Sequence, residues 1–154
     1  MKQQKILIGN ISAIIWGEKS DKAYIFVHGN MSNKESAEVF AGIAEKKGWQ
    51  TISFDLPGHG ERTQEDEYKC NIWNGIRDLT AVGDYAEGEW KRLSLFACSI
   101  GAFFSLHAYS AKRFEHCLFQ SPTLDMEYLI GQMMIWFNVS EDMLKEKREI
   151  ETPI

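Results

Sequence analysis

Ser99 is the residue of this sequence whose surroundings best suit catalytic chemistry. It lies in the run Ala97-Cys98-Ser99-Ile100-Gly101, after an apolar stretch of strand length at 93–96 and before a helix-like stretch at 102–109. A serine on a sharp turn from a strand into a helix holds its hydroxyl outside the sheet, and such a turn tolerates only small neighbours. The pattern A-x-S-x-G therefore predicts a serine nucleophile.

The segments on either side of Ser99 alternate between strand and helix patterns. Residues 5–16 read as two strands joined by a tight turn at Gly9-Asn10. From residue 22 onward, apolar runs of strand length alternate with stretches of helical spacing. The predicted strands are 22–27, 49–54, 93–96 and 117–119, and the predicted helices are 36–47, 71–90 and 102–109.

This alternation predicts an α/β fold. We expect a three-layer sandwich with a mostly parallel sheet, helices on both faces and an antiparallel N-terminal strand pair. Ser36 is the expected cap of the helix over 36–47. Residues 61–68 are charged and without period, which predicts a loop. Two further helices are expected, an apolar one over 126–137 and a charged one over 141–150.

The composition limits the class of protein. A chain of 154 residues predicts a single domain, with its core over 5–122. The net charge of −5 argues against a nucleic-acid partner. We expect no membrane span and no secretory signal. The three cysteines are widely spaced, which predicts reduced thiols in a cytoplasmic protein and no metal site.

Three motifs in this order resemble the α/β-hydrolase superfamily. They are FVHGN at 26–30, FDLPGHGER at 54–62 and ACSIG at 97–101, and each follows a predicted strand. The resemblance covers about residues 6–122. Open α/β sheets bind ligands beyond the carboxyl ends of their strands, where all three motifs lie.

The resemblance implies a serine hydrolase that acts on small carboxylic esters or related acyl compounds, without a cofactor. Ser99 would be the nucleophile, and the backbone N–H groups of Asn30 and Ile100 would form the oxyanion hole. The substrate site would include His28, Gly29, Met31 and Met133. Residues 123–150 would form a helical segment similar to the lids of that family.

The remaining triad members are harder to place. The family order is nucleophile, acid, histidine, and Asp125 is the candidate acid. His107 and His116 follow Ser99, but neither lies in a loop after a later strand. His28 and His59 precede the nucleophile and are expected to be structural. The sequence therefore predicts a form truncated before the catalytic histidine.

Three hypotheses remain open from the sequence. The chain could be the N-terminal piece of a serine hydrolase. It could instead be an intact short protein that has lost catalysis and binds acyl ligands or a partner. In the third hypothesis the chain self-associates, because the strand near Leu118 would be an open sheet edge.

Overall fold

The computed structural model describes residues 1–65, 67–148 and 150. The chain divides into two compact units, Met1–Pro122 and Thr123–Ile154, which are described separately. The first unit contains the sheet and the three motifs. The second contains two helices.

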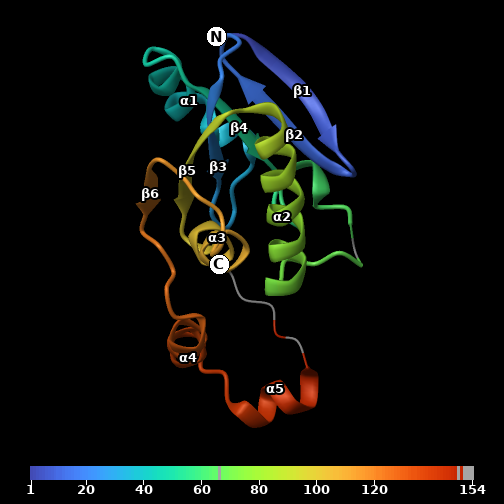
Figure 1. Cartoon of the computed structure of the whole chain (residues 1–154). Coiled ribbons are helices and arrows are strands. Elements are labelled where there is room, and N and C mark those ends of the chain that lie inside the picture. The colour runs from blue at the N-terminus through green and yellow to red at the C-terminus, as the bar shows by residue number, and fades with distance from the viewer. Residues whose placement is uncertain (66, 149, 151–154) are drawn as a thin grey trace. The chain divides into compact units, whose positions relative to one another are not determined.

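The first unit is built on a six-stranded mixed sheet with the order β1-β2-β4-β3-β5-β6. Strands β1, β2 and β4 are antiparallel neighbours, and β4, β3, β5 and β6 are parallel ones. Figure 1 shows β1 and β6 at opposite ends of the sheet. The strands are β1 Gln3–Ile8, β2 Ile11–Trp16, β3 Lys22–Val27, β4 Gln50–Phe54, β5 Arg92–Cys98 and β6 Cys117–Gln120. The predicted sheet and its antiparallel N-terminal pair are therefore confirmed.

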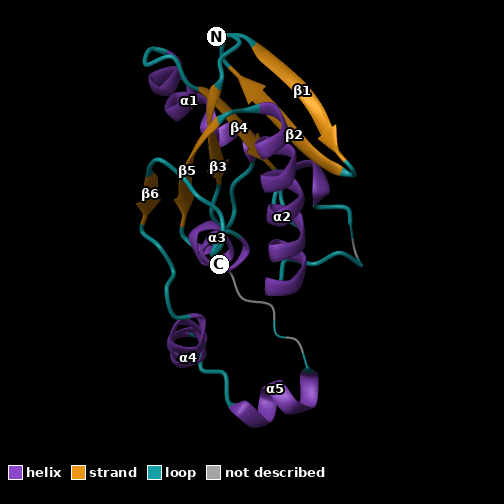
Figure 2. Cartoon of the chain, viewed as in Figure 1, coloured by secondary structure: helices purple, strands orange, loops and turns teal. Residues whose placement is uncertain are grey.

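Helices cover both faces of this sheet, as Figure 2 shows. Helix α1, Glu38–Glu45, packs on one face, where Ala37 and Ala41 meet Trp16 and Phe26. Helices α2, Ile72–Glu89, and α3, Ile100–Ala108, pack on the other face around the larger hydrophobic core. The central strands are buried on both sides, which explains their continuous apolar sequences.

Two local predictions differ from the structure. The helix predicted from residue 36 begins as a 3-10 turn, Lys34–Ala37, before α1 starts. The cap is Asn33 rather than Ser36, because the Asn33 side chain accepts the Ser36 N–H at 3.2 Å. The predicted loop over 61–68 starts within a second 3-10 turn, Gly60–Arg62, whose Arg62 is buried.

The second unit contains α4, Met126–Trp136, and α5, Glu141–Lys147. Side chains cap both helices: Asp125 accepts the Tyr128 N–H at 2.9 Å, and Ser140 accepts the Met143 N–H at 3.2 Å. Within the described residues, no helix has the length and apolar character needed to cross a bilayer.

Candidate functional site

Ser99 joins β5 to α3 in a strained backbone conformation. Its φ of 50° and ψ of −120° lie outside the regions that L residues normally occupy. The Ser99 N–H donates to the Gln120 carbonyl of β6 at 3.0 Å, and the Ser99 carbonyl accepts the Ala102 N–H at 3.0 Å. Strain of this kind persists only where the surrounding structure enforces it, and it concentrates at functional sites. The turn predicted from A-x-S-x-G is therefore present as a sharp elbow.

The small residues around Ser99 are required by close contacts. A Cβ on Gly101 would lie 2.3 Å from the His28 carbonyl oxygen and 2.9 Å from Cγ1 of Val27. A Cβ on Gly29 would lie 3.2 Å from Cβ of Ser99. Ala97 is completely buried beneath the elbow. The loop after β3 and the elbow after β5 are thus packed against one another.

A pocket of about 310 Å³ opens beside this elbow. It lies at the carboxyl ends of β3 and β5, as expected for an open α/β sheet. Its apolar wall contains Phe26 and Phe96, whose rings stack with centroids 4.8 Å apart. The remaining lining residues are His28, Gly29, Asn30, Ser32, Ser36, Cys98, Ser99 and Gln120.

The predicted oxyanion donors lie on the two sides of this contact. Asn30 follows Gly29 in the loop after β3, and Ile100 is the first residue of α3. A first helical residue has no acceptor within its own helix, so its N–H is available to a ligand. Within the described part of the chain, neither the Asn30 N–H nor the Ile100 N–H donates to a backbone carbonyl. The site could therefore offer two backbone donors near Ser99.

His28 is held as a neutral structural residue. Its Nε2 accepts the Leu56 N–H at 3.1 Å, so the proton must be on Nδ1, which donates to the Gly29 carbonyl at 2.7 Å. Desolvation by burial lowers the pKa of His28 to about 4, with the nearby His59 adding to the effect. Both ring nitrogens are occupied, so His28 cannot accept the Ser99 proton in this arrangement.

The other histidines do not reach Ser99 either. Nδ1 of His59 lies 2.9 Å from the Pro57 carbonyl, and Nε2 lies 3.1 Å from Oδ1 of Asn30. His107 packs its ring on Phe103 along α3. His116 is exposed just before β6. In the described residues, no histidine forms a hydrogen bond with Ser99.

The other predicted site residues are distributed differently. Met31 is 78% exposed and lines a neighbouring hollow with Asn30 and His59 instead of the Ser99 pocket. Asp125 caps α4 through its carboxylate, and Met133 lies within α4. Both belong to the second unit. The structure thus groups Ser99, His28, Gly29 and Asn30 around one pocket.

A buried ion pair beside the site was not predicted from the sequence. Lys34 and Asp55 are both fully buried, with Nζ and Oδ2 2.6 Å apart. Asp55 also accepts the backbone N–H groups of Lys34 at 2.8 Å and of Glu61 at 3.1 Å. A Cβ on Gly60 would lie 2.3 Å from this carboxylate, so the turn closes around it. The motif FDLPGHGER contained Asp55 as a possible signal, whereas nothing marked Lys34.

A second buried cluster ties the same motif to α2. Arg62 donates to the carboxylate of Asp78 and to the carbonyl of Asp55 at 3.2 Å. Asp78 also accepts the Tyr68 hydroxyl at 2.8 Å, and Glu65 binds the outer side of Arg62. Although burial alone lowers the pKa of Arg62, its bonds to Glu65 and Asp78 raise it overall. These charges fix the loop that follows β4.

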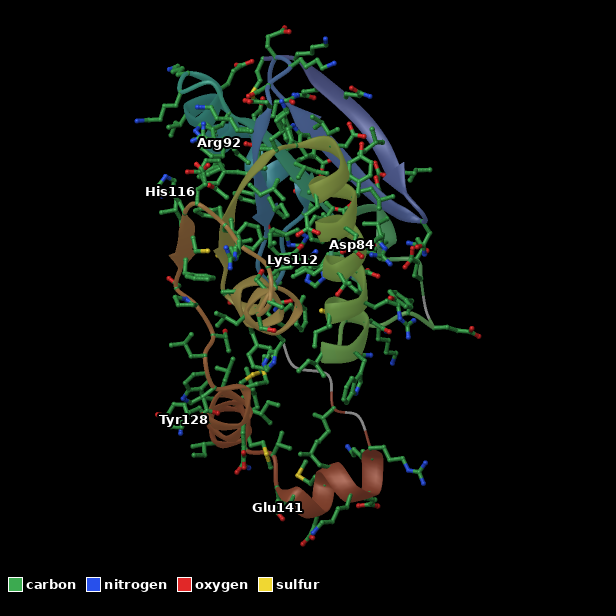
Figure 3. All side chains as sticks on the ribbon, in the orientation of Figure 1. Asp84, Arg92, Lys112, His116, Tyr128 and Glu141 are labelled. Carbon is green, nitrogen blue, oxygen red and sulfur yellow. The ribbon has the colours of Figure 1, made fainter. Side chains whose placement is uncertain are left out.

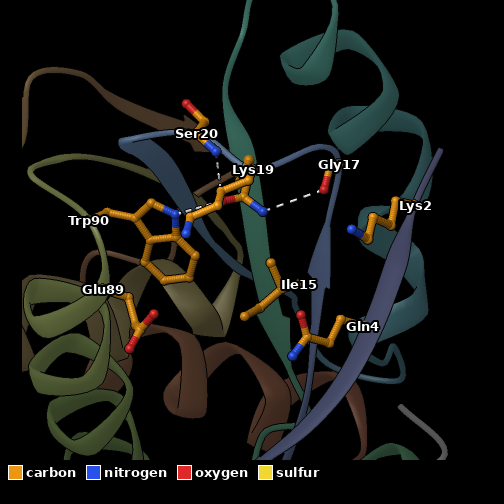
Figure 4. A pocket seen from close by; sticks show the side chains of 9 residues that line it. Lys2, Gln4, Ile15, Gly17, Lys19, Ser20, Glu89 and Trp90 are labelled. Carbon is orange, nitrogen blue, oxygen red and sulfur yellow. Dashed lines mark hydrogen bonds between the residues drawn. The ribbon is translucent and has the colours of Figure 1, made fainter.

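A separate hollow of about 270 Å³ lies where β4 begins (Figure 4). The Gln50 amide lines this hollow and is already bonded: its oxygen accepts from Trp90 Nε1 at 2.9 Å and from the Ser20 N–H at 3.2 Å. Its nitrogen donates to the Gly17 carbonyl at 3.4 Å. These bonds hold β2, β4 and α2 together, so we assign this hollow a structural role.

Comparison with known proteins supports the fold. No protein-family model matches the sequence. A serine hydrolase-like protein of Dictyostelium discoideum is 33% identical over 95 residues, which cover 60% of this chain and 26% of that protein.

Solved structures match over most of the chain. Two structures of a Pyrococcus furiosus esterase match 94% of this chain. The first has a TM-score of 0.65 at 21% identity, over 57% of the esterase chain. The second has a TM-score of 0.69 at 19% identity, over 62% of the esterase chain. A monoacylglycerol lipase of Paleococcus ferrophilus has a TM-score of 0.61 at 13% identity, over 84% of this chain and 52% of the lipase. The chain therefore spans less than two thirds of these relatives. The resemblance inferred from the three motifs is confirmed at the level of structure: this chain has the α/β-hydrolase fold.

Proposed function

We propose that this chain is a serine hydrolase that acts on small carboxylic esters or related acyl compounds through Ser99. The observation that carries the proposal is the conformation of Ser99, with φ of 50° and ψ of −120°, beside a pocket of about 310 Å³. The esterase and lipase names of the structural relatives are consistent with it. No cofactor or metal is part of the proposal.

In the proposed reaction, Oγ of Ser99 attacks the acyl carbon of the ester. The negative charge that develops on the carbonyl oxygen would be bound by the N–H groups of Asn30 and Ile100. Loss of one such donor typically costs about 10²–10³ in rate. The rings of Phe26 and Phe96 would contact the apolar part of the acyl chain.

Several finer assignments belong to this proposal. His28 and Gly29 would shape the pocket floor, and Met31 would contribute from the neighbouring hollow. Asp125 is the proposed acid and Met133 a proposed substrate-site residue, both on the ground of the family resemblance. The three cysteines, Cys70, Cys98 and Cys117, are free thiols, which supports a cytoplasmic location.

A second candidate function is acyl binding without turnover. It is favoured by the engaged ring nitrogens of His28 and by the lack of a histidine bonded to Ser99 among the described residues. Without a general base a serine hydroxyl is a weak nucleophile at neutral pH. A pocket with two free N–H donors would still bind a carboxylate or carbonyl oxygen.

The two candidates are separated by labelling with a fluorophosphonate probe, followed by intact mass. A single adduct on the wild type that is absent from Ser99→Ala supports the hydrolase. Ser110→Ala is the matched control, because Ser110 is an exposed serine outside the Ser99 pocket, and it should label like the wild type. Absence of any adduct, together with saturable binding of a short-chain fatty acid, would favour the binding protein.

A further inference from the structure

The two edges of the sheet differ in how they are protected. The edge strand β1 carries Lys5, an exposed lysine that lies 3.9 Å from Glu61. The opposite edge strand β6, Cys117–Gln120, has no charged residue, and all four of its residues are exposed. Leu118 is 44% exposed and Phe119 is 40% exposed. Natural proteins protect an open edge with charges or by keeping the edge strand short; β6 is short but uncharged, so its outward groups are open to a partner strand.

The hydrogen bonds to β5 identify which groups of β6 face outward. The His116 carbonyl accepts the Leu95 N–H at 2.8 Å, and the Gln120 carbonyl accepts the Ser99 N–H at 3.0 Å. Alternate residues of a parallel strand bond to the same neighbour. The N–H and C=O groups of Cys117 and Phe119 therefore face away from β5.

The strand ends restrict how a partner strand can align. Before β6, the Glu115 N–H turns inward and donates to the Leu93 carbonyl at 2.8 Å. After β6, Ser121 has a φ of 45°, which ends the extended conformation. Cys117 and Phe119 are therefore the two residues of β6 that can bond to a partner through both their N–H and their C=O groups. In an antiparallel pair centred on Leu118, β6 can bond to β6 of a second copy, because Cys117 of each copy then faces Phe119 of the other.

This register also places a histidine near the pocket. His116 of one copy lies directly opposite Gln120 of the other, and residues 116, 118 and 120 share one face of the strand. Gln120 lines the Ser99 pocket on that face. Figure 3 shows His116 at the outer margin of the sheet, beside β6. Two strand spacings, about 10 Å, then separate the Cα atoms of Ser99 and the opposing His116.

We propose that two copies of this chain pair through β6 about an axis at Leu118, and that each copy supplies His116 to the Ser99 pocket of the other. The second half of this statement rests on the proposed hydrolase function. A second copy is the occupant that fits, because the strand matches itself in length, in outward-facing groups and in apolar character. No like charges meet in this register, since His116 faces Gln120 and Glu115 faces Ser121.

The histidine completes the chemistry that Ser99 cannot perform alone. The Ser99 Oγ–H proton passes to the imidazole of the opposing His116 while the bond from Oγ to the acyl carbon forms. The same proton then goes to the oxygen of the leaving alcohol as its bond to the acyl carbon breaks. Water repeats these two steps on the acyl-serine, which releases the carboxylic acid and restores Ser99.

The dimer is tested by sedimentation velocity on the full chain. The wild type should sediment as a dimer at high micromolar concentration, and Leu118→Lys should be a monomer. Val39→Lys, which changes a 78% exposed residue of α1, is the matched control and should remain dimeric. A monomeric wild type would overturn the proposal. If the Cys117 and Phe119 amides of such a monomer were protected from hydrogen exchange, the chain would cover its own edge.

The register is tested by cross-linking. With Cys117→Ser as the background, Leu118→Cys should give a covalent dimer on oxidation, because the two new thiols face one another at the axis. Phe119→Cys in the same background should not, because it faces position 117. The reverse result would overturn the alignment on which the placement of His116 depends.

The role of His116 is tested by the rate of fluorophosphonate labelling. His116→Gln should slow labelling of Ser99 by about 100-fold or more, the usual contribution of a general base. His107→Gln, at the other exposed histidine after Ser99, should leave the rate unchanged. Mixing His116→Gln with Ser99→Ala should restore labelling of the first variant, because mixed dimers contain one complete site.

The outcomes separate the two proposals. If the dimer forms but His116→Gln labels like the wild type, the shared site is wrong and the hydrolase proposal stands. If no variant and no wild-type protein labels, the hydrolase proposal and the shared site both fail. The β6 pairing is then decided by sedimentation and cross-linking alone.

Discussion

Lys34 and Asp55 form an ion pair sealed from solvent, with Nζ and Oδ2 2.6 Å apart and both side chains fully buried. Although burial by itself lowers the pKa of Lys34, the hydrogen bond and charge of Asp55, with those of Glu35, raise it overall. The pair connects the loop after β3 to the end of β4. Ser32 and Ser36, on either side of Lys34, line the Ser99 pocket, so the pair helps to hold that wall of the site in place.

Substitution of Lys34 should therefore lower the stability of the folded protein. Lys34→Met leaves the Asp55 carboxylate buried without its cation, and breaking a buried pair in this way typically costs about 3–5 kcal/mol. The free energy of unfolding, measured by urea denaturation, should fall by this amount. Lys46→Met, at an exposed lysine after α1, should change it by no more than about 0.5 kcal/mol. Equal losses in the two variants would contradict the structural role of the pair.

The stability of the protein should depend on pH through His28. Its pKa is lowered by burial from the ordinary 6.5 to about 4 in the folded state. Between these values the unfolded chain binds a proton that the folded protein does not, so stability falls as the pH drops from 6.5 to 4. The loss from this one group is about 3 kcal/mol over the range.

The pH effect is isolated by comparing variants. The free energy of unfolding at pH 6.5 and at pH 4.5 should differ less in His28→Gln than in the wild type, because glutamine has no group that binds this proton. Carboxylates that titrate in the same range contribute equally to both proteins. His107→Gln changes an exposed histidine and should keep the wild-type pH dependence.

Two glycine-to-alanine substitutions should have opposite signs. In Gly101→Ala the new Cβ would lie 2.3 Å from the His28 carbonyl oxygen, so the elbow must shift. We expect a loss of about 2 kcal/mol or more in stability. In Gly42→Ala, within α1, no heavy atom lies within 4 Å of the new Cβ. Helix propensity then favours alanine by up to about 1 kcal/mol. Thermal denaturation would refute this if both midpoints moved in the same direction.

The buried hydrogen bond between Trp90 and Gln50 should contribute to the stability of the fold. Its indole N–H donates to the Gln50 amide oxygen at 2.9 Å in a buried setting. Trp90→Phe removes this donor, and because the Ser20 N–H still bonds to the same oxygen, the loss of one hydrogen bond should cost about 0.5–1.5 kcal/mol. Trp73→Phe is the control, because Trp73 is 76% exposed and its substitution should be nearly neutral. Urea denaturation of both variants measures the difference.

The fold could be predicted from the sequence because its signals are local and repeated. Buried parallel strands are continuous apolar runs, and their alternation with helical spacing leaves few possible topologies. The elbow was also predictable, since Gly101 and Ala97 are the small residues that a tight turn at Ser99 needs. The surroundings of Ser99 in the structure agree with this interpretation.

The buried charges could not be predicted in this way. Lys34 and Asp55 are 21 residues apart, and a lysine in a polar stretch is normally solvated. The start of the helix near residue 36 was missed for a related reason. The Ser36 hydroxyl donates to the Asn33 carbonyl at 2.7 Å, so Ser36 belongs to a 3-10 turn rather than to the cap. Hydrophobic spacing marks the buried face of a helix but not the geometry of its first turn.

Asp78 receives hydrogen bonds from both Arg62 and Tyr68, so one carboxylate of α2 holds two points of the loop after β4. The loop cannot detach without leaving a buried charge on the helix. Loop and helix should therefore open together in native-state hydrogen exchange, as one cooperative unit.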